Sequence, residues 1–119
     1  MIFHITTRSA WSDAQENGRY TADSLRIEGF IHCSTLSQVL PVADKFYKGE
    51  ETLILLMIEP ALLSSDLKWE SPSGGPPPPG VSEGDRFPHI YGPINLDAIL
   101  KVFDLETDPD GKHTVPGLD

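Results

Sequence analysis

The sequence has a single cysteine, Cys33, among its 119 residues. One thiol excludes an internal disulfide bond and any zinc site built from several cysteines. Basic residues are scarce as well: nine Lys and Arg stand against eighteen Asp and Glu, so the formal net charge is −9. An acidic chain of this kind repels phosphate backbones and anionic lipid surfaces. We therefore expect neither general nucleic-acid binding nor membrane association.

Long hydrophobic runs are also missing. The longest apolar run covers residues 53–58, whereas a membrane-spanning helix needs about 20 apolar residues. The N-terminus lacks the basic region and apolar core of a secretion signal, so we expect a cytoplasmic protein. The length fits one compact domain, and 39% apolar with 23% charged residues is ordinary for a globular chain.

Short β-rich segments alternate with helical ones along residues 1–107. The β-rich segments are residues 1–6, 30–34, 52–58, 67–70, 87–94 and 98–105. A short helix is expected after a cap at Ser9 or Ser12, ending at Asn17-Gly18, and a further helical turn is expected around Ser24. This order predicts a single α+β domain with a mostly antiparallel sheet of short strands, one long helix and one or two short helices.

The long helix is predicted from apolar residues at steps of three and four, which form one buried face. These residues are Leu36, Val39, Leu40, Ala43, Phe46 and Tyr47. Ser34 and Thr35 are the candidate caps, and Gly49 is the expected end of the helix. The continuously apolar run 52–58 that follows predicts a strand covered on both faces.

Two segments are expected outside the sheet. Residues 71–84 contain four consecutive prolines flanked by glycines, which predicts a polyproline-like or flexible loop. The loop joins Glu70 to the segment around His89, so it is either a lid beside a cleft or an exposed insertion. The acidic, Pro- and Gly-containing residues 108–119 are expected to form a mobile tail.

Three histidines each occur in a strand-like apolar or aromatic segment, and each is followed two positions later by a hydroxyl-bearing residue. The pairs are His4 with Thr6, His32 with Ser34, and His89 with Tyr91. Residues two apart in a strand share a face, so the three strands are predicted to present these pairs to one cleft. The alternative is that the pairs satisfy one another at a strand edge. The fourth histidine, His113, lies in the expected tail.

The residues around such a cleft allow several functional interpretations. Three imidazoles could bind zinc and leave a position for water, but the short histidine spacings of metal motifs are absent, so we assign no metal site. Cys33 alternates with His32 and Ser34 and is expected to face the core. Trp11 either stacks on a ligand ring or packs against the sheet. Arg86 either clamps an anionic group or pairs with a nearby carboxylate.

The longest motifs carry a resemblance to known proteins. Glu-Gly-Phe-Ile-His-Cys-Ser at 28–34 and Phe-Pro-His-Ile-Tyr-Gly-Pro at 87–93, with Phe-His-Ile-Thr at 3–6, resemble the bacterial family catalogued as domain of unknown function 952. That resemblance runs from Ile2 to about Leu105. The opening His-Ile-Thr at 4–6, followed by Trp11, and residues 29–34 are also distantly similar to the ADP-ribosyltransferase superfamily, especially its RNA 2′-phosphotransferases.

The distant resemblance implies an ADP-ribosyltransferase-like fold and a cleft that binds or transforms NAD, ADP-ribose or a related nucleotide-like small molecule. No cofactor is required, and NAD would be a substrate. The implied catalytic residues are His32, His4, His89 and Glu70, with Glu70 next to an oxocarbenium-like transition state. The residues expected to bind the ligand, some of them from their own chemistry and spacing, are Thr6, Ser34, Tyr91, Trp11 and Arg86. The chain departs from the pattern in two ways: no late glutamate aligns clearly, and it has only four arginines.

Two hypotheses from other classes stand beside this one. The first is a non-catalytic binding or regulatory module whose histidines are structural. The second is a metal hydrolase with histidine ligands. The sequence gives no oligomeric state.

Overall fold

The largest sheet has β4 at its centre. The computed structural model describes residues 1–47, 52–72, 81 and 84–118. Its first sheet has the order β1-β4-β8-β9, and every neighbouring pair is antiparallel. The strands are β1 (Ile2–Thr7), β4 (Leu53–Ile58), β8 (Ile99–Thr107) and β9 (His113–Thr114).

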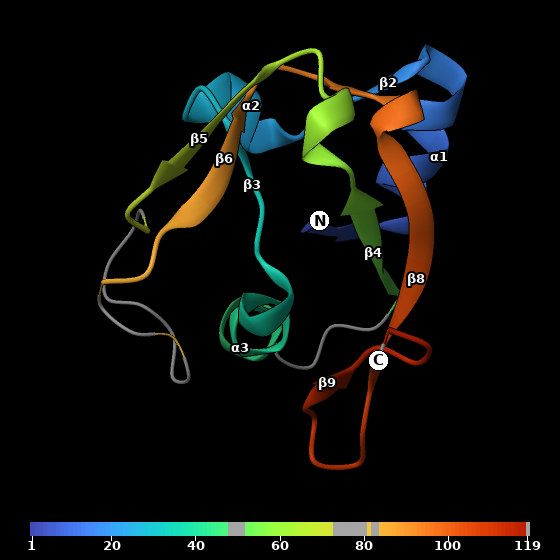
Figure 1. Ribbon diagram of the computed structural model, residues 1–119. Helices are drawn as coiled ribbons and strands as arrows, with labels where there is room; N and C mark the ends of the chain where they lie inside the picture. The colour runs from blue at the N-terminus through green and yellow to red at the C-terminus, as the bar shows by residue number, and fades with distance from the viewer. Residues whose placement is uncertain (48–51, 73–80, 82–83, 119) are drawn as a thin grey trace.

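Two smaller sheets lie beside the first one (Figure 1). One has the order β3-β6-β5, and the other pairs β2 with β7, all antiparallel. The strands are β2 (Arg19–Tyr20), β3 (Ile31–His32), β5 (Asp66–Glu70), β6 (Phe87–Tyr91) and β7 (Ile94–Asn95). A β-bridge between Phe3 and Ser34, with both N···O distances at 2.8 Å, connects β1 to the chain just after β3. This bridge brings the first and second predicted histidine segments together.

Helix α1 (Arg8–Asn17) follows β1 directly and begins earlier than the sequence suggested. Its cap is Thr7, whose Oγ1 accepts a hydrogen bond from the amide of Ala10, so the expectation of a cap at Ser9 or Ser12 was wrong. The helix ends at Gly18. Its φ of 82° is a left-handed conformation that glycine adopts without strain because it has no Cβ atom. The predicted helical turn around Ser24 is confirmed as α2 (Asp23–Ile27).

Helix α3 (Leu36–Phe46) starts with a capping box in which Thr35 and Gln38 satisfy each other's backbone amides. Its expected single buried face is only half correct. Val39 and Ala43 are fully buried, but Leu36, Leu40 and Phe46 are 38–58% exposed. The reason is that the first sheet meets only the side of the helix that carries Val39 and Ala43. The expected end at Gly49 lies outside the described residues.

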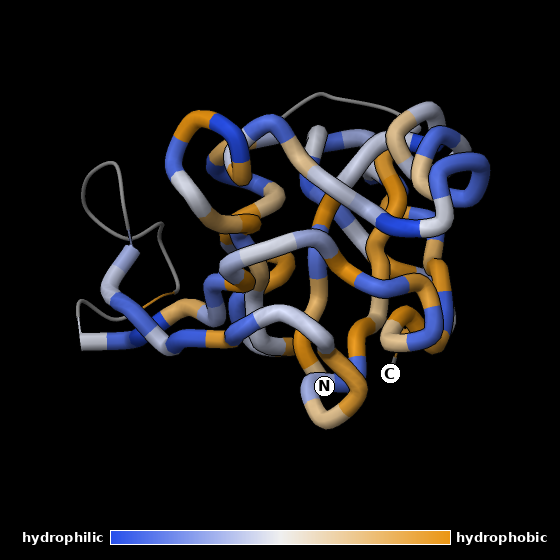
Figure 2. Tube along the Cα trace, turned by 90° about the horizontal axis from the view of Figure 1, so that it is seen from above, coloured by the Kyte–Doolittle hydropathy of each residue, from blue (hydrophilic) through white to orange (hydrophobic). Residues whose placement is uncertain are grey.

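The core lies on both faces of β4, as the continuous apolar run predicted. Ile54, Leu56 and Ile58 pack towards α1, β3, β6 and β7, while Leu53 and Leu55 pack towards α3 and the chain after β9. Figure 2 shows the hydrophobic stretches running through the middle of the molecule. Each such fully buried aliphatic side chain contributes about 1.5–3 kcal/mol.

The α+β class and the antiparallel arrangement are confirmed, with the strands divided among three sheets. Two short 3₁₀ helices, η1 (Pro60–Leu62) and η2 (Leu96–Ala98), connect them. Among the residues that the structure describes, no helix is long and apolar enough to cross a membrane.

The segment 108–118 folds back on the domain. His113 is 3% exposed, and both its amide and its ring Nδ1 contact Asp44 Oδ1 on α3, at 2.8 Å and 3.1 Å. The mobility expected for 108–119 stays a prediction. No local pattern in the sequence indicates the contact between His113 and Asp44. Most of the Pro-rich loop, residues 73–80 and 82–83, lies outside the described residues.

Candidate functional site

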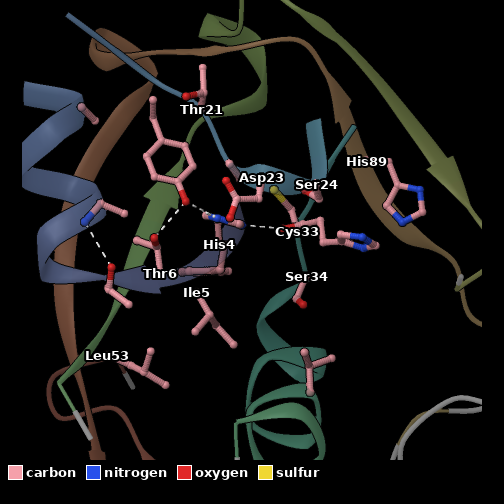
Figure 3. Close-up of a pocket in the computed structure, with 18 of the residues that line it drawn as sticks. His4, Ile5, Thr6, Thr21, Asp23, Ser24, Cys33, Ser34, Leu53 and His89 are labelled. Carbon is pink, nitrogen blue, oxygen red and sulfur yellow. Dashed lines mark hydrogen bonds between the residues drawn. The ribbon is translucent and has the colours of Figure 1, made fainter. Parts of the chain in front are cut away.

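The predicted histidine segments meet at one cavity of about 960 Å³. Its walls come from β1, α1, α2, β3, the C-terminal half of α3 and β6 (Figure 3). Five of the predicted site residues line it: His4, Thr6, His32, Ser34 and His89. Figure 3 shows His4 and Thr6 on one side and His89 on the other, with Cys33 and Ser34 between them. The structure therefore brings the three histidine segments together at one cavity, although Tyr91, which was expected there with them, does not line it.

His4 sits in the wall of the cavity with both ring nitrogens engaged by the protein. Its Nδ1 lies 2.5 Å from the carbonyl oxygen of His32, and its Nε2 lies 2.7 Å from the Tyr20 hydroxyl. A carbonyl only accepts, so Nδ1 carries the proton. Burial lowers the pKa of His4 to about 4, which outweighs the opposing hydrogen bond to the His32 carbonyl. His4 is therefore neutral at pH 7.

A neutral His4 orders the hydroxyl groups next to it. With the proton on Nδ1, Nε2 accepts from the Tyr20 hydroxyl, and the Tyr20 oxygen is left to accept from Thr6 across 2.8 Å. Burial raises the pKa of Tyr20 to about 12, so the phenol keeps its proton. This fully paired chain makes His4, Tyr20 and Thr6 a rigid part of the wall.

His32 belongs to the same cavity but is much more accessible. Its side chain is 44% exposed, and its Nε2 lies 2.7 Å from Glu28 Oε2, just after α2. The backbone carbonyl of the same residue holds His4. His32 thus has a structural backbone and a side chain that is open to a ligand.

We expect the variant His32→Ala to fold with nearly unchanged stability. The half-exposed pair with Glu28 contributes at most about 1 kcal/mol, and the carbonyl bond to His4 does not need the imidazole. Urea unfolding of the variant and the wild type measures the difference. A loss above about 2 kcal/mol would show a structural role for the imidazole.

His89 occupies the β6 side of the cavity and is buried, with a side-chain exposure of 3%. Its Nδ1 lies 2.9 Å from Glu70 Oε1, and the Tyr91 hydroxyl donates to the same oxygen. Both bonds lower the pKa of Glu70, and the bond from Tyr91 has the larger effect. The bond to Glu70 in turn raises the pKa of Tyr91. Phe30 stacks on the His89 ring at a centroid distance of 4.2 Å. The ring is therefore fixed from its face and from its Nδ1 edge.

Four predicted site residues are not among those that line the cavity. Glu70 and Tyr91 reach it only through His89. Trp11 packs against the core, and Arg86 Nη1 donates to the carbonyl of Trp69 at 3.4 Å. The catalytic role expected for Glu70 and the ligand-binding roles expected for the other three stay predictions, and this placement does not support them. Cys33 is buried, as expected, and burial raises the pKa of its thiol.

Sequence reasoning missed three residues that shape the site: Tyr20, Glu28 and Phe30. Glu28 stands four residues before His32, a spacing that was available as a signal. Phe30 lies inside the motif at 28–34, where the pattern predicts only a strand residue. Tyr20 gave no signal, because its contact with His4 depends on the turn between α1 and α2.

The cavity wall is acidic. It carries three carboxylates, Asp13, Asp23 and Glu28, and one guanidinium, Arg19. Within the described part of the chain, no three His, Cys, Asp or Glu side chains are arranged to hold a metal ion. The metal-hydrolase hypothesis therefore has no ligand set there. Pro72, at the start of the predicted loop, also lines the cavity.

Comparisons with known proteins agree with the long motifs. Residues 5–102 match the model of a family described as a protein of unknown function, DUF952. The crystal structure of protein CC0527 from Caulobacter crescentus is 36% identical, covers 95% of this chain and 92% of its own, and has a TM-score of 0.78. The solution NMR structure of CC0527 is 35% identical, covers 98% and 91%, and has a TM-score of 0.74. None of the curated proteins matches.

Proposed function

This chain belongs to the DUF952 family, and we propose that its cavity binds NAD, ADP-ribose or a related nucleotide-like small molecule. The observation that carries the proposal is the cavity itself: about 960 Å³, with Thr6, Ser34, the half-exposed His32 and the buried His89 in its wall. This volume is at the upper end of the range for small-molecule sites. Hydroxyl and imidazole groups suit the hydroxyl and amide groups of a ribose and its base.

The charges decide which part of such a ligand enters. Three wall carboxylates against one guanidinium disfavour a phosphate inside the cavity. The uncharged or cationic part of the ligand, its base and ribose, is therefore the part that fits. Phosphate groups would lie beside the exposed Arg19.

The contacts divide the predicted residues into two groups. Both ring nitrogens of His4 are occupied by protein groups, so His4 supports the wall rather than binding the ligand. His32, Ser34 and His89 are the residues left to contact it. The non-catalytic alternative requires all three histidines to be structural. Of the three, only His4 has both ring nitrogens bound by protein groups in the described contacts.

Isothermal titration calorimetry with NAD, ADP-ribose and AMP tests the proposal. We expect saturable heat with at least one of them and a roughly tenfold weaker affinity for Ser34→Ala, which removes a cavity hydroxyl. Ser12→Ala is the matched control, because Ser12 is exposed on α1 and does not line the cavity. Flat titrations with all three ligands at millimolar concentration would rule the ligand class out.

A further inference from the structure

Two histidine–carboxylate pairs lie at the cavity, and their hydrogen bonds fix opposite tautomers. His89 presents Nδ1 to Glu70, so a neutral ring keeps its proton there and leaves Nε2 as the acceptor. His32 presents Nε2 to Glu28, so its neutral ring leaves Nδ1. The nitrogen available to a ligand is therefore Nε2 on one ring and Nδ1 on the other.

The two rings are neighbours. Their centroids are 5.5 Å apart at an interplanar angle of 75°, and Phe30 packs against both. One ligand atom group in the cavity can therefore be reached by both imidazoles. Two proton-transfer groups that reach one bond are what general acid–base catalysis requires.

We propose that His89 and His32 are an acid–base pair that hydrolyses an O-linked ribosyl group, with Glu70 and Tyr91 as positioning residues. The inference rests on the proposed function for the ribose-containing ligand. It adds a reaction and a division of roles between the two histidines.

The roles follow from burial. His89 is enclosed, and Glu70 at its Nδ1 stabilises the imidazolium that forms when Nε2 takes a proton, so His89 is the base. His32 is half-exposed beside Glu28, so solvent can return the proton that it gives up, and His32 is the acid. The surrounding carboxylates also favour the positive charge that develops on a ribosyl ring.

The step balances with water as the only co-reactant. His89 Nε2 takes a proton from water as the water oxygen bonds to ribose C1′. The bond from C1′ to the departing oxygen breaks, its electron pair goes to that oxygen, and the oxygen takes a proton from His32. The products are a free ribose hydroxyl and an alcohol. Proton exchange with solvent then restores both rings.

Nitrogen–proton NMR correlations of the ¹⁵N-labelled full chain test the positioning roles without any ligand. At a pH where the rings are neutral, we expect the proton on Nδ1 of His89 and on Nε2 of His32. In Glu70→Ala, His89 should become a mixture of tautomers, while the charge-matched Glu106→Gln, exposed on β8, should change nothing. A His89 proton on Nε2 in the wild type, or an unchanged tautomer in Glu70→Ala, overturns the inference.

Two ribosides with different leaving groups test the catalytic roles. A p-nitrophenyl riboside departs without protonation, whereas a benzyl riboside needs an acid. His32→Gln should lower hydrolysis of the benzyl riboside about 100-fold and that of the p-nitrophenyl riboside far less, while His89→Gln should lower both about 100-fold. Equal losses for both ribosides in His32→Gln overturn the assignment of the acid.

The results separate this inference from the proposed function. Calorimetric binding of ADP-ribose without hydrolysis of either riboside overturns the acid–base pair and leaves the ligand class standing. Riboside hydrolysis with flat nucleotide titrations supports the acid–base pair and overturns the nucleotide assignment.

Discussion

Replacing His4 with alanine is expected to lower the free energy of unfolding by about 3 kcal/mol. The imidazole connects the His32 carbonyl on one side with the Tyr20 hydroxyl on the other, and the residue is only 8% exposed. Its removal leaves both groups without their partner at the edge of the core. Total stabilities of small domains are about 5–15 kcal/mol, so the loss is a large fraction. Urea unfolding at neutral pH measures it.

Two other variants show whether the loss comes from this hydrogen-bond chain. Tyr20→Phe removes one hydroxyl and keeps the ring, so we expect about 1 kcal/mol. His32→Ala removes an exposed ring and keeps the carbonyl, so it should change stability least. If His4→Ala cost no more than His32→Ala, the buried chain would not stabilise the fold.

The strands and the shared face of the histidines were predictable because they depend on local periodicity. The apolar run at 53–58 predicted a strand buried on both faces, and β4 is that strand. The two-residue spacing from His4 to Thr6 and from His32 to Ser34 predicted four side chains that do line one cavity, although Ile5 and Cys33 between them line it as well. Such patterns are set by the backbone geometry of a strand and need no knowledge of tertiary contacts.

The partners of these residues were not predictable, because tertiary packing chooses them. Tyr20 reaches His4 only because α1 ends at Gly18 and turns the chain back. His113 reaches Asp44 across 69 residues of sequence. Tertiary packing also decides which predicted core residues stay exposed. Helical periodicity predicts an apolar face that includes Leu36 and Phe46, but it does not predict how much of that face a neighbouring sheet covers.

The stability of the protein is expected to fall as the pH drops from about 6.5 towards 4, and His4 is the reason. Its pKa is about 4 in the folded protein against 6.5 in an unfolded chain. Between these values the unfolded chain binds a proton that the folded protein does not, so acid favours unfolding. The contribution is fully present above pH 6.5, and about 2 kcal/mol of it is lost by about pH 5.

The variant His4→Gln isolates this effect, because glutamine fills the same wall and does not titrate. We expect the free energy of unfolding of the wild type to fall about 2 kcal/mol more than that of the variant between about pH 7 and pH 5. The carboxylates, including Glu70 with its lowered pKa, lose their contributions mostly below this window. Urea unfolding of both proteins at three pH values in this range gives the two slopes. Parallel slopes would mean that His4 takes up its proton in the folded protein as readily as in the unfolded chain, which the buried bonds to Tyr20 and to the His32 carbonyl oppose.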